Sequence, residues 1–346
     1  MSTYKKNGIP PKGCAYVGVA TVDTMVNEEV KFGKKFGSHR AYFKADKVDK
    51  AVATAQDDVL NNRLPWLSFK LPLSWSDMAA GKGDSWAEDL ANKLGSVPGP
   101  VWIAMHHEPE NDGPIKDWVS MQKRLAPIFK KKENLAYTII LTGWQLLYPS
   151  NPELSMDNAW PGKEYVDIIG IDPYNWYSTA NRTTGVKTYS WTELKQYYEK
   201  LVEWLAKSGN EDVSWAVAET GLPDEAAATP MNYVASNKKV VATSGPGKEW
   251  IQRATTDLIE MGGVMLNYFD VPPTTNSEPP SWSWPLNSDI KKADFVSAVS
   301  KTSFFNVLQQ DSIAIGKYSQ QGIELDREIA GLKNTIAQLN NKLYRA

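Results

Sequence analysis

The sequence contains very little cysteine and histidine. Cys14 is the single cysteine among 346 residues, and His39, His106 and His107 are the only histidines. One cysteine cannot form a disulfide within the chain, and zinc sites built mainly from cysteine and histidine need more of both residues. We therefore expect no disulfide framework, no metal centre and no cofactor.

An excess of one charge and long apolar runs are also missing. The chain has 38 Lys and Arg against 40 Asp and Glu, a net charge of −2, so it offers no basic surface for nucleic acid or an anionic membrane. No stretch reaches about 18 uncharged apolar residues, and the N-terminus, MSTYKKNGIPPKG, lacks the apolar core of a signal peptide. We expect no nucleic-acid partner, no membrane partner and no export signal.

Aromatic residues, in contrast, are abundant. The chain has 14 Trp, 15 Tyr and 9 Phe, within 42% hydrophobic and 23% charged residues, a composition typical of a folded protein with a sizeable core. The tryptophan content exceeds what such a core usually needs. Flat apolar rings with polar edges suit sugar faces, although core packing is the alternative for each ring.

Short apolar runs recur along the chain and predict buried strands. They lie at 15–22, 40–44, 64–70, 101–107, 136–142, 166–172, 213–219 and 263–269. The repeat length is about 35 residues, enough for a strand, a helix and two loops. Eight such units predict an α/β fold of the (βα)8 TIM barrel type.

The segments between the runs carry helical patterns. Residues 190–208 place apolar side chains on one helical face, with Ser190 and Glu193 in the spacing of a capping box and Gly209 at the end. Residues 248–263 repeat this pattern. The competing architecture is an open doubly wound sheet, but the first predicted strand is not followed by the glycine-rich dinucleotide motif, and a P-loop is absent.

The last part of the chain has a different periodicity. Its apolar positions alternate in steps of three and four: Gly322, Leu325, Ile329, Leu332, Ile336, Leu339 and Leu343. This heptad pattern predicts a C-terminal coiled-coil helix that joins copies of the chain into a homo-oligomer, a parallel dimer or a trimer. An amphipathic helix folded onto the barrel is the alternative. The predicted divisions are an N-terminal segment 1–13, the barrel 14–300, a linker 301–317 and the coiled coil 318–346.

Two glutamates follow predicted strands at the barrel mouth. The fourth strand ends in HHEPEND, which contains Glu108, and the seventh ends in AETG, which contains Glu219. Carboxyl ends of barrel strands surround one cleft, and glycoside hydrolysis needs two carboxyl groups, one as acid and one as nucleophile or base. The sequence therefore predicts catalytic roles for both. The alternative for Glu219 is a buried ion pair with Arg40 or Lys70.

Other polar and aromatic residues near strand ends are candidates for substrate binding. Strand alternation points His106 and His107 in opposite directions, so only one can line the cleft. We expect Glu110 and Asp112 to be solvated loop charges. The residues predicted to bind substrate are His107, Arg40, Lys70, Trp144, Asp172, Tyr174, Trp176, Tyr268, Asp270 and Trp282.

Three motifs together resemble a known family. The H-E pair at 107–108, DIIGIDPY at 167–174 and AETG at 218–221 are similar to motifs of glycoside hydrolase family 26, a member of the clan A retaining barrels. The resemblance implies that Glu108 is the acid/base and Glu219 the nucleophile, with His107 beside the acid and Tyr174 near the nucleophile. It also implies a β-linked polysaccharide substrate, mainly β-mannan and less often mixed-linkage β-glucan or β-xylan. The substrate that we expect is therefore mannan-like, with a bacterial surface glycan as the other expectation.

The combination of a barrel, a coiled coil and no export signal suggests a second hypothesis. It resembles bacteriophage minor tail proteins, in which such barrels are displayed on the virion. On that hypothesis the barrel is a carbohydrate-binding or structural module of a phage tail tip, without catalysis, and its partners include other tail proteins. Fold alone does not decide between the two.

Overall fold

The computed structural model describes residues 6–188, 191–228, 232–235, 238–241, 247–272 and 280–303. The chain divides into two compact units, residues 1–305 and 306–346. The second unit lies outside the described residues, and so do the heptad positions and the predicted coiled coil.

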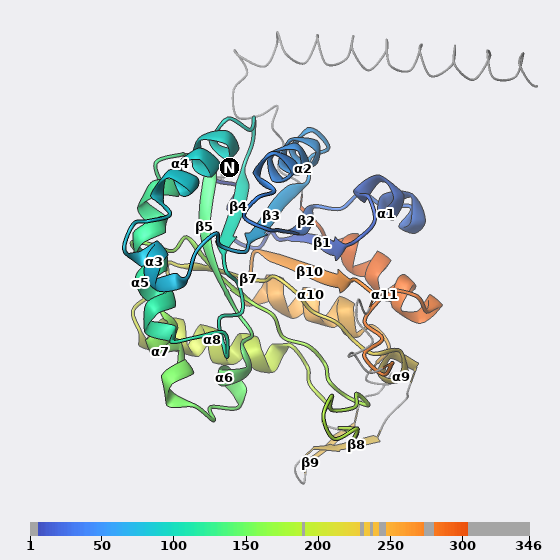
Figure 1. Cartoon of the computed structure of the whole chain (residues 1–346). Helices are drawn as coiled ribbons and strands as arrows, with labels where there is room; N and C mark the ends of the chain where they lie inside the picture. The colour runs from blue at the N-terminus through green and yellow to red at the C-terminus, as the bar shows by residue number, and fades with distance from the viewer. Residues whose placement is uncertain are drawn as a thin grey trace, which may run out of the picture. The chain divides into compact units, whose positions relative to one another are not determined.

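Eight parallel strands close into a barrel, as predicted (Figure 1). Around the barrel they follow the order β1, β10, β7, β6, β5, β4, β3, β2. The closed ring excludes the open doubly wound sheet. The strands are β1 (Tyr16–Thr21), β2 (Ser38–Phe43), β3 (Leu64–Phe69), β4 (Val101–Met105), β5 (Leu135–Leu141), β6 (Ile168–Ile171), β7 (Ser214–Val217) and β10 (Met265–Asp270).

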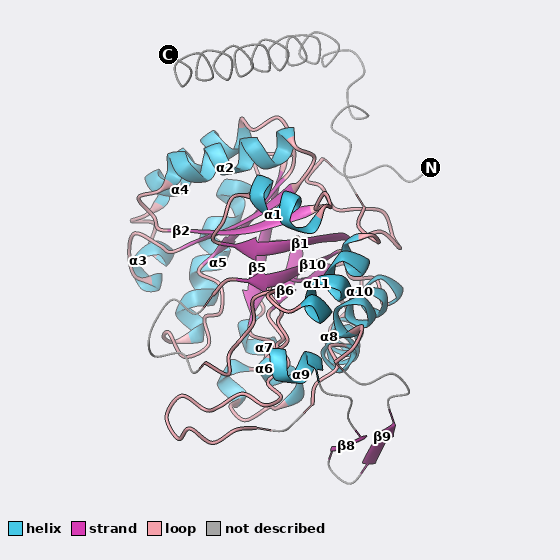
Figure 2. Cartoon of the chain, turned by 90° about the vertical axis from the view of Figure 1, so that its right-hand side faces the viewer, coloured by secondary structure: helices cyan, strands magenta, loops and turns pink. Residues whose placement is uncertain are grey.

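Helices surround the barrel strands (Figure 2). The apolar faces of these helices are buried. The longer ones are α1 (Met25–Phe32), α2 (Val48–Leu60), α4 (Asp84–Gly95), α5 (Ile115–Phe129), α8 (Lys195–Lys207), α10 (Trp250–Glu260) and α11 (Asp289–Val299). Shorter elements interrupt the loops: α3 (Trp75–Ala79), α6 (Trp144–Leu147), the 3-10 helix η1 (Pro152–Leu154), α7 (Met156–Ala159) and α9 (Asp224–Ala228). An antiparallel hairpin, β8 (Asn232–Ala235) and β9 (Lys238–Val241), is separate from the barrel sheet.

Helix α8 begins later than the sequence pattern predicts. It starts at Lys195, and Leu194 precedes it without a side-chain cap. Ser190 lies outside the described residues, and the Glu193 carboxylate accepts hydrogen bonds from Trp191 Nε1 at 2.9 Å and Arg253 Nη2 at 3.0 Å. Glu193 therefore ties α8 to α10 instead of closing a capping box. The helix ends as expected, with Gly209 at a positive φ of 70°.

Large side chains fill the barrel interior. Trp66 is fully buried, and its Nε1 donates to Thr138 Oγ1 at 2.9 Å. A side chain at Gly170 would place its Cβ 2.8 Å from the Trp66 ring, so only glycine leaves room for this indole. The interior is thus a packed core, and any binding space lies above it at the strand ends.

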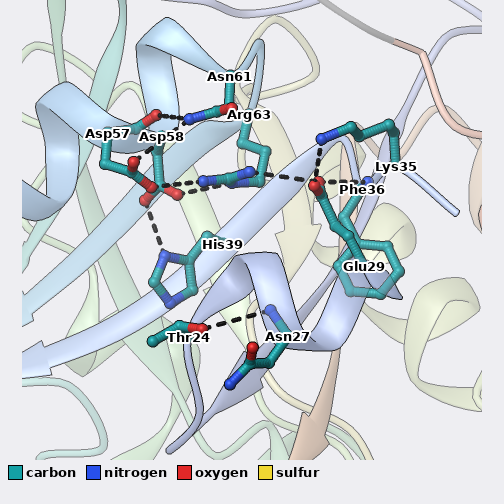
Figure 3. A network of polar contacts seen from close by, with 10 residues as sticks. All are labelled: Thr24, Asn27, Glu29, Lys35, Phe36, His39, Asp57, Asp58, Asn61 and Arg63. Atoms are coloured by element: carbon teal, nitrogen blue, oxygen red, sulfur yellow. Dashed lines mark hydrogen bonds and ion pairs between the residues drawn. The ribbon is translucent and has the colours of Figure 1, made fainter. Parts of the chain in front are cut away.

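A buried ion-pair network joins α1, α2 and the beginning of β3 (Figure 3). The fully buried Arg63 donates to Asp58 at 2.8 Å, to Asp57 at 2.7 Å and to Glu29 at 3.3 Å. His39 Nδ1 lies 2.8 Å from the second Asp58 oxygen. Because Arg63 precedes β3, the network stabilises the barrel at its amino-terminal end, opposite the carboxyl ends of the strands.

Candidate active site

A cavity of about 990 Å³ opens at the carboxyl ends of the barrel strands. Glu108 follows β4, Thr142 follows β5, Asp172 follows β6 and Glu219 follows β7, and all four residues line it. The two glutamates predicted to be catalytic therefore face one space. The rest of the lining includes Glu110, Trp144, Tyr148, Tyr174, Trp176, Arg182, Phe269, Trp282 and Trp284.

The Glu108 side chain is placed by an unusual backbone. The Glu108 N–H donates to Ile140 O of β5 at 2.9 Å, whereas the His106 N–H donates to Phe69 O of β3 at 2.9 Å. Both His106 and Glu108 have positive φ, 52° and 51°, a conformation that non-glycine residues rarely adopt and that is enriched at functional sites. The turn at the end of β4 thus directs the Glu108 carboxyl into the cavity.

Burial, followed by the negative charges of Glu219 and Glu110, raises the pKa of Glu108 to about 8. Arg40 and Lys70 act in the opposite direction but less strongly. A carboxyl group with this pKa keeps its proton near neutral pH, because the apolar surroundings and the second carboxylate both disfavour the charged form. Glu108 can therefore donate a proton to a bound molecule.

Glu219 has a different environment. Its Oε1 lies 3.5 Å from Arg40 Nη2, and its Oε2 accepts a hydrogen bond from Tyr174 Oη at 3.1 Å. Arg40 is fully buried, and burial with the nearby Glu219 charge holds the pKa of Tyr174 well above its ordinary value. The Glu219 carboxyl oxygens thus lie against a guanidinium and against a phenol that keeps its proton, and both groups are hydrogen-bond donors. The buried ion pair proposed as an alternative exists, but Glu219 also lines the cavity.

The two neighbouring histidines diverge. His107 packs against the Tyr42 ring, with centroids 5.5 Å apart, and burial lowers its pKa well below the ordinary value, so it is neutral. His106 Nε2 lies 2.8 Å from Asp112 Oδ2, and its ring meets the edge of Trp75 at 4.9 Å. His106 thus supports the loop beyond β4. His107 lies near the Arg40 side of the site but is not part of the cavity lining.

Two further carboxyl groups face the cavity. Asp172 is 3% exposed, and neither of its carboxyl oxygens has a hydrogen-bond partner within the described residues; burial raises its pKa well above the ordinary value. Glu110 is also largely buried, and its Oε1 accepts hydrogen bonds from Thr142. The expectation that Glu110 is a solvated loop charge is therefore wrong. Asp112, by comparison, is an exposed loop residue paired with His106.

Aromatic rings form much of the remaining lining. Tyr174 packs on Trp284 at 5.0 Å between ring centroids, and Trp176 packs on both Trp282 at 4.9 Å and Trp284 at 5.2 Å. Trp144, at the start of α6 beyond β5, also lines the cavity and is 44% exposed. The predicted positions Trp144, Tyr174, Trp176 and Trp282 are thus all on the cavity surface.

Four other predicted binding residues do not reach the cavity. Arg40 lies under Glu219, and Lys70 is on the surface with its Nζ 3.8 Å from Asp112. Tyr268 is fully buried, and its hydroxyl donates to Trp284 O at 2.8 Å. Asp270 accepts hydrogen bonds from Leu286 N at 2.7 Å and Lys31 Nζ at 2.9 Å. These four residues are therefore placed behind or beside the cavity lining, and their roles in substrate binding stay predictions.

Sequence reasoning also missed a supporting residue, Lys291. This α11 side chain is fully buried, and its Nζ donates to Ser283 O at 2.8 Å and Trp284 O at 3.2 Å, with a longer contact to Leu222 O at 3.4 Å. Lys291 and Tyr268 together fix the backbone that carries Trp284. A lysine in a surface helix has no sequence signal that distinguishes it from a solvated one.

In the part of the chain that the structure describes, no three His, Cys, Asp or Glu side chains gather in a way that could hold a metal ion. Among the same residues, none of the helices is long and apolar enough to cross a membrane.

Comparisons with known proteins identify the architecture. No family model and no curated protein matches the sequence. A fungal beta-1,4-galactanase structure aligns with a TM-score of 0.56 at 14% identity, over 82% of this chain and 98% of that chain. A glucosidase from Croceicoccus marinus aligns with a TM-score of 0.52 at 7% identity, over 86% of this chain and 70% of that chain. The barrel is shared with solved glycosidases.

The resemblance to family 26 stays a prediction. The GH26 domain of an endo-beta-mannanase/endo-beta-glucanase from Prevotella bryantii aligns at 13% identity over 82% of this chain and 92% of that chain. Its TM-score of 0.45 is too low to carry an argument about the family. The comparisons therefore show the (βα)8 fold alone.

Proposed function

We propose that the protein is a retaining glycoside hydrolase that cleaves a β-linked polysaccharide by double displacement. Glu219 is the nucleophile and Glu108 is the acid/base. The observation that carries the proposal is the contrast between two glutamates in one cavity. Burial and neighbouring carboxylates keep Glu108 protonated, whereas the Glu219 carboxyl group contacts the Arg40 guanidinium and accepts a hydrogen bond from the Tyr174 hydroxyl. Such a division of roles between two carboxyl groups is what glycoside hydrolysis needs.

The proposed reaction has two steps. Glu219 attacks the anomeric carbon while Glu108 donates its proton to the departing glycosidic oxygen, which leaves a glycosyl ester on Glu219. Glu108, now a carboxylate, then takes a proton from a water molecule, and the resulting hydroxide displaces Glu219. The hydrogen bond from Tyr174 and the charge of Arg40 stabilise the departing Glu219 carboxylate. Two inversions give net retention.

The aromatic lining supports a carbohydrate as the ligand. Trp144, Trp176 and Trp282 present apolar ring surface to the cavity beside the carboxyl groups, and rings with polar edges suit the faces of pyranose sugars. Within this reaction class we propose a mannan-like polysaccharide or a bacterial surface glycan, cleaved within the chain, and membership of a family 26-like group. The three sequence motifs support that finer assignment.

The first test is a hydrolysis assay. Release of reducing ends is measured from β-mannan, β-1,4-galactan, β-glucan, xylan and bacterial surface glycans, with wild type, Glu219→Gln and, as a matched surface control, Glu211→Gln. We expect activity in the wild type and in the Glu211 variant, a loss of at least about a thousandfold in the Glu219 variant, and retained anomeric configuration by NMR. Inverted product would overturn the double displacement.

If the wild type releases reducing ends from none of these glycans, the proposal that the protein is a glycoside hydrolase is rejected. Retained binding of a glycan in that case would favour the second hypothesis, a carbohydrate-binding barrel of a phage tail tip. The heptad pattern at 318–346 supports a related proposal, that copies of the chain associate through this segment and display several barrels together. Sedimentation of the full chain tests it, and a monomer at micromolar concentration would contradict it.

A further inference from the structure

A third glutamate in the cavity helps to raise the pKa of Glu108, but its own carboxyl group takes no part in the bond changes of the proposed double displacement. Glu110 lies two residues after Glu108 and lines the same cavity. Its Oε1 accepts hydrogen bonds from the Thr142 backbone N–H at 2.9 Å and from Thr142 Oγ1 at 3.0 Å. These two bonds join the loop after β4 to the end of β5 and fix the orientation of the carboxyl group.

The second oxygen of Glu110 is left without a partner. Oε2 is buried and makes no hydrogen bond within the described residues. A buried carboxyl oxygen without a donor is costly, and such atoms in native proteins usually have a functional explanation. Because Oε1 is already held by Thr142, a donor that reaches Oε2 from the cavity would satisfy the group without disturbing the loop.

An exposed aromatic pair adjoins the same threonine. Trp144 and Tyr148 pack together with ring centroids 4.3 Å apart and planes at 33°, yet they are 44% and 42% exposed and both line the cavity. The Trp144 N–H contacts Thr142 Oγ1 at 3.4 Å. Thr142 therefore connects a carboxyl acceptor with an apolar ring surface, the combination that binds a sugar by its hydroxyls and its face.

The position of Glu108 indicates on which side of the scissile bond the Glu110 carboxyl group and the Trp144 ring lie. An acid that protonates the glycosidic oxygen faces the leaving group. Glu108 is hydrogen-bonded to Ile140 near the end of β5, and Glu110 and Trp144 lie on the loops after β4 and β5. Glu219, after β7, is separated from β5 by β6 in the barrel.

Resting on the proposed function, we propose that Glu110 and Trp144 form the binding site for the sugar on the leaving-group side, with Glu110 Oε2 accepting a sugar hydroxyl and Trp144 stacking on the ring. The enzyme then requires a saccharide as its leaving group and cleaves within chains. A glycoside with a small aryl leaving group does not use this site.

The experiment compares two leaving groups on the same glycone. Wild type, Glu110→Gln, Trp144→Ala and the control Glu211→Gln are assayed on 2,4-dinitrophenyl biosides and on hexasaccharides of β-1,4-mannose, β-1,4-galactose and β-1,4-glucose. Thermal unfolding verifies that each variant is folded. For Trp144→Ala we expect kcat/KM on the hexasaccharide to fall at least about tenfold more than on the aryl bioside. For Glu110→Gln we expect the same at pH 5, where Glu108 keeps its proton with or without the Glu110 charge.

The outcomes separate this inference from the proposed function. Equal losses on both substrates, or no loss, would overturn the leaving-group site and leave Glu110 as a support for the β4 loop. Wild-type cleavage of a hexasaccharide but of no aryl bioside would support the site directly. If the wild type cleaves neither class, nor any glycan of the hydrolysis assay, the proposed function is overturned and the inference with it. The Glu211 variant is expected to match the wild type throughout.

Discussion

Replacing Glu108 with glutamine is expected to stabilise the protein, and increasingly so as the pH rises. The ordinary pKa of this carboxyl is 4.5 and the folded protein raises it to about 8. Between these values the unfolded chain has lost the proton while the folded chain keeps it, so the wild type loses about 1.4 kcal/mol of stability per pH unit. Glutamine is neutral in both states and avoids this loss.

The magnitude follows from the interval between 4.5 and about 8. The advantage of Glu108→Gln is near zero at pH 4, about 2 kcal/mol at pH 6 and at most about 5 kcal/mol above pH 8. For a folded unit of about 300 residues, 1 kcal/mol corresponds to about 1.6 °C in melting temperature. The expected gain is therefore about 3 °C at pH 6 and up to about 8 °C at pH 8.5.

Differential scanning calorimetry of the two proteins at pH 4.5, 6, 7 and 8.5 measures this gain. Subtracting the wild-type curve removes titrations common to both proteins. The groups that face Glu108 (Glu219, Glu110, Asp172, Arg40 and Lys70) are present in both. Glu211→Gln, on an exposed loop, is expected to show no pH-dependent gain. A Glu108 variant whose gain is the same at pH 4.5 and 8.5 would refute the raised pKa and weaken its role as the acid.

Three further predictions concern other parts of the molecule. Arg63→Met leaves Asp58 buried without its cation, so we expect a loss of about 3–5 kcal/mol in urea unfolding with kcat unchanged; an unchanged midpoint would contradict the importance of the network. Lys291→Met removes the donor to Trp284 O, and we expect KM to rise about threefold or more with a change in tryptophan emission. An unaltered KM and emission spectrum would show that Lys291 is not needed to position Trp284. Leu332→Asp places a charge at a heptad d position and should reduce the sedimentation coefficient of an oligomer to that of a monomer; equal coefficients would exclude association through the heptads.

The strands could be predicted from the sequence because their physical requirement is simple. A strand buried on both faces needs a short run of apolar residues, and each of the runs at 15–22, 101–107 and 213–219 coincides with a barrel strand. Once the barrel is inferred, the residues that follow the strands must meet at one end. Glu108 and Glu219 were found in this way.

The details of the site depend on directions that a linear pattern does not contain. Tyr268 is within β10, and strand alternation alone does not tell whether its ring faces the cavity or the layer behind it. Glu110 was misjudged because a loop residue after a proline has no periodicity, and only the fold brings Thr142 next to it. The β8–β9 hairpin was missed because residues 229–246 carry no strong apolar alternation.

The buried Arg40 makes the proposed nucleophile part of the barrel core. Its guanidinium is fully buried, with the Tyr42 ring 4.6 Å from Cζ and Glu219 as its ion-pair partner. Loss of the Glu219 charge would leave this buried cation without a counter-ion and without access to water. A lineage that abandons catalysis is therefore expected to lose the arginine and the glutamate together, and a relative that keeps both has a physical reason to be tested for hydrolysis.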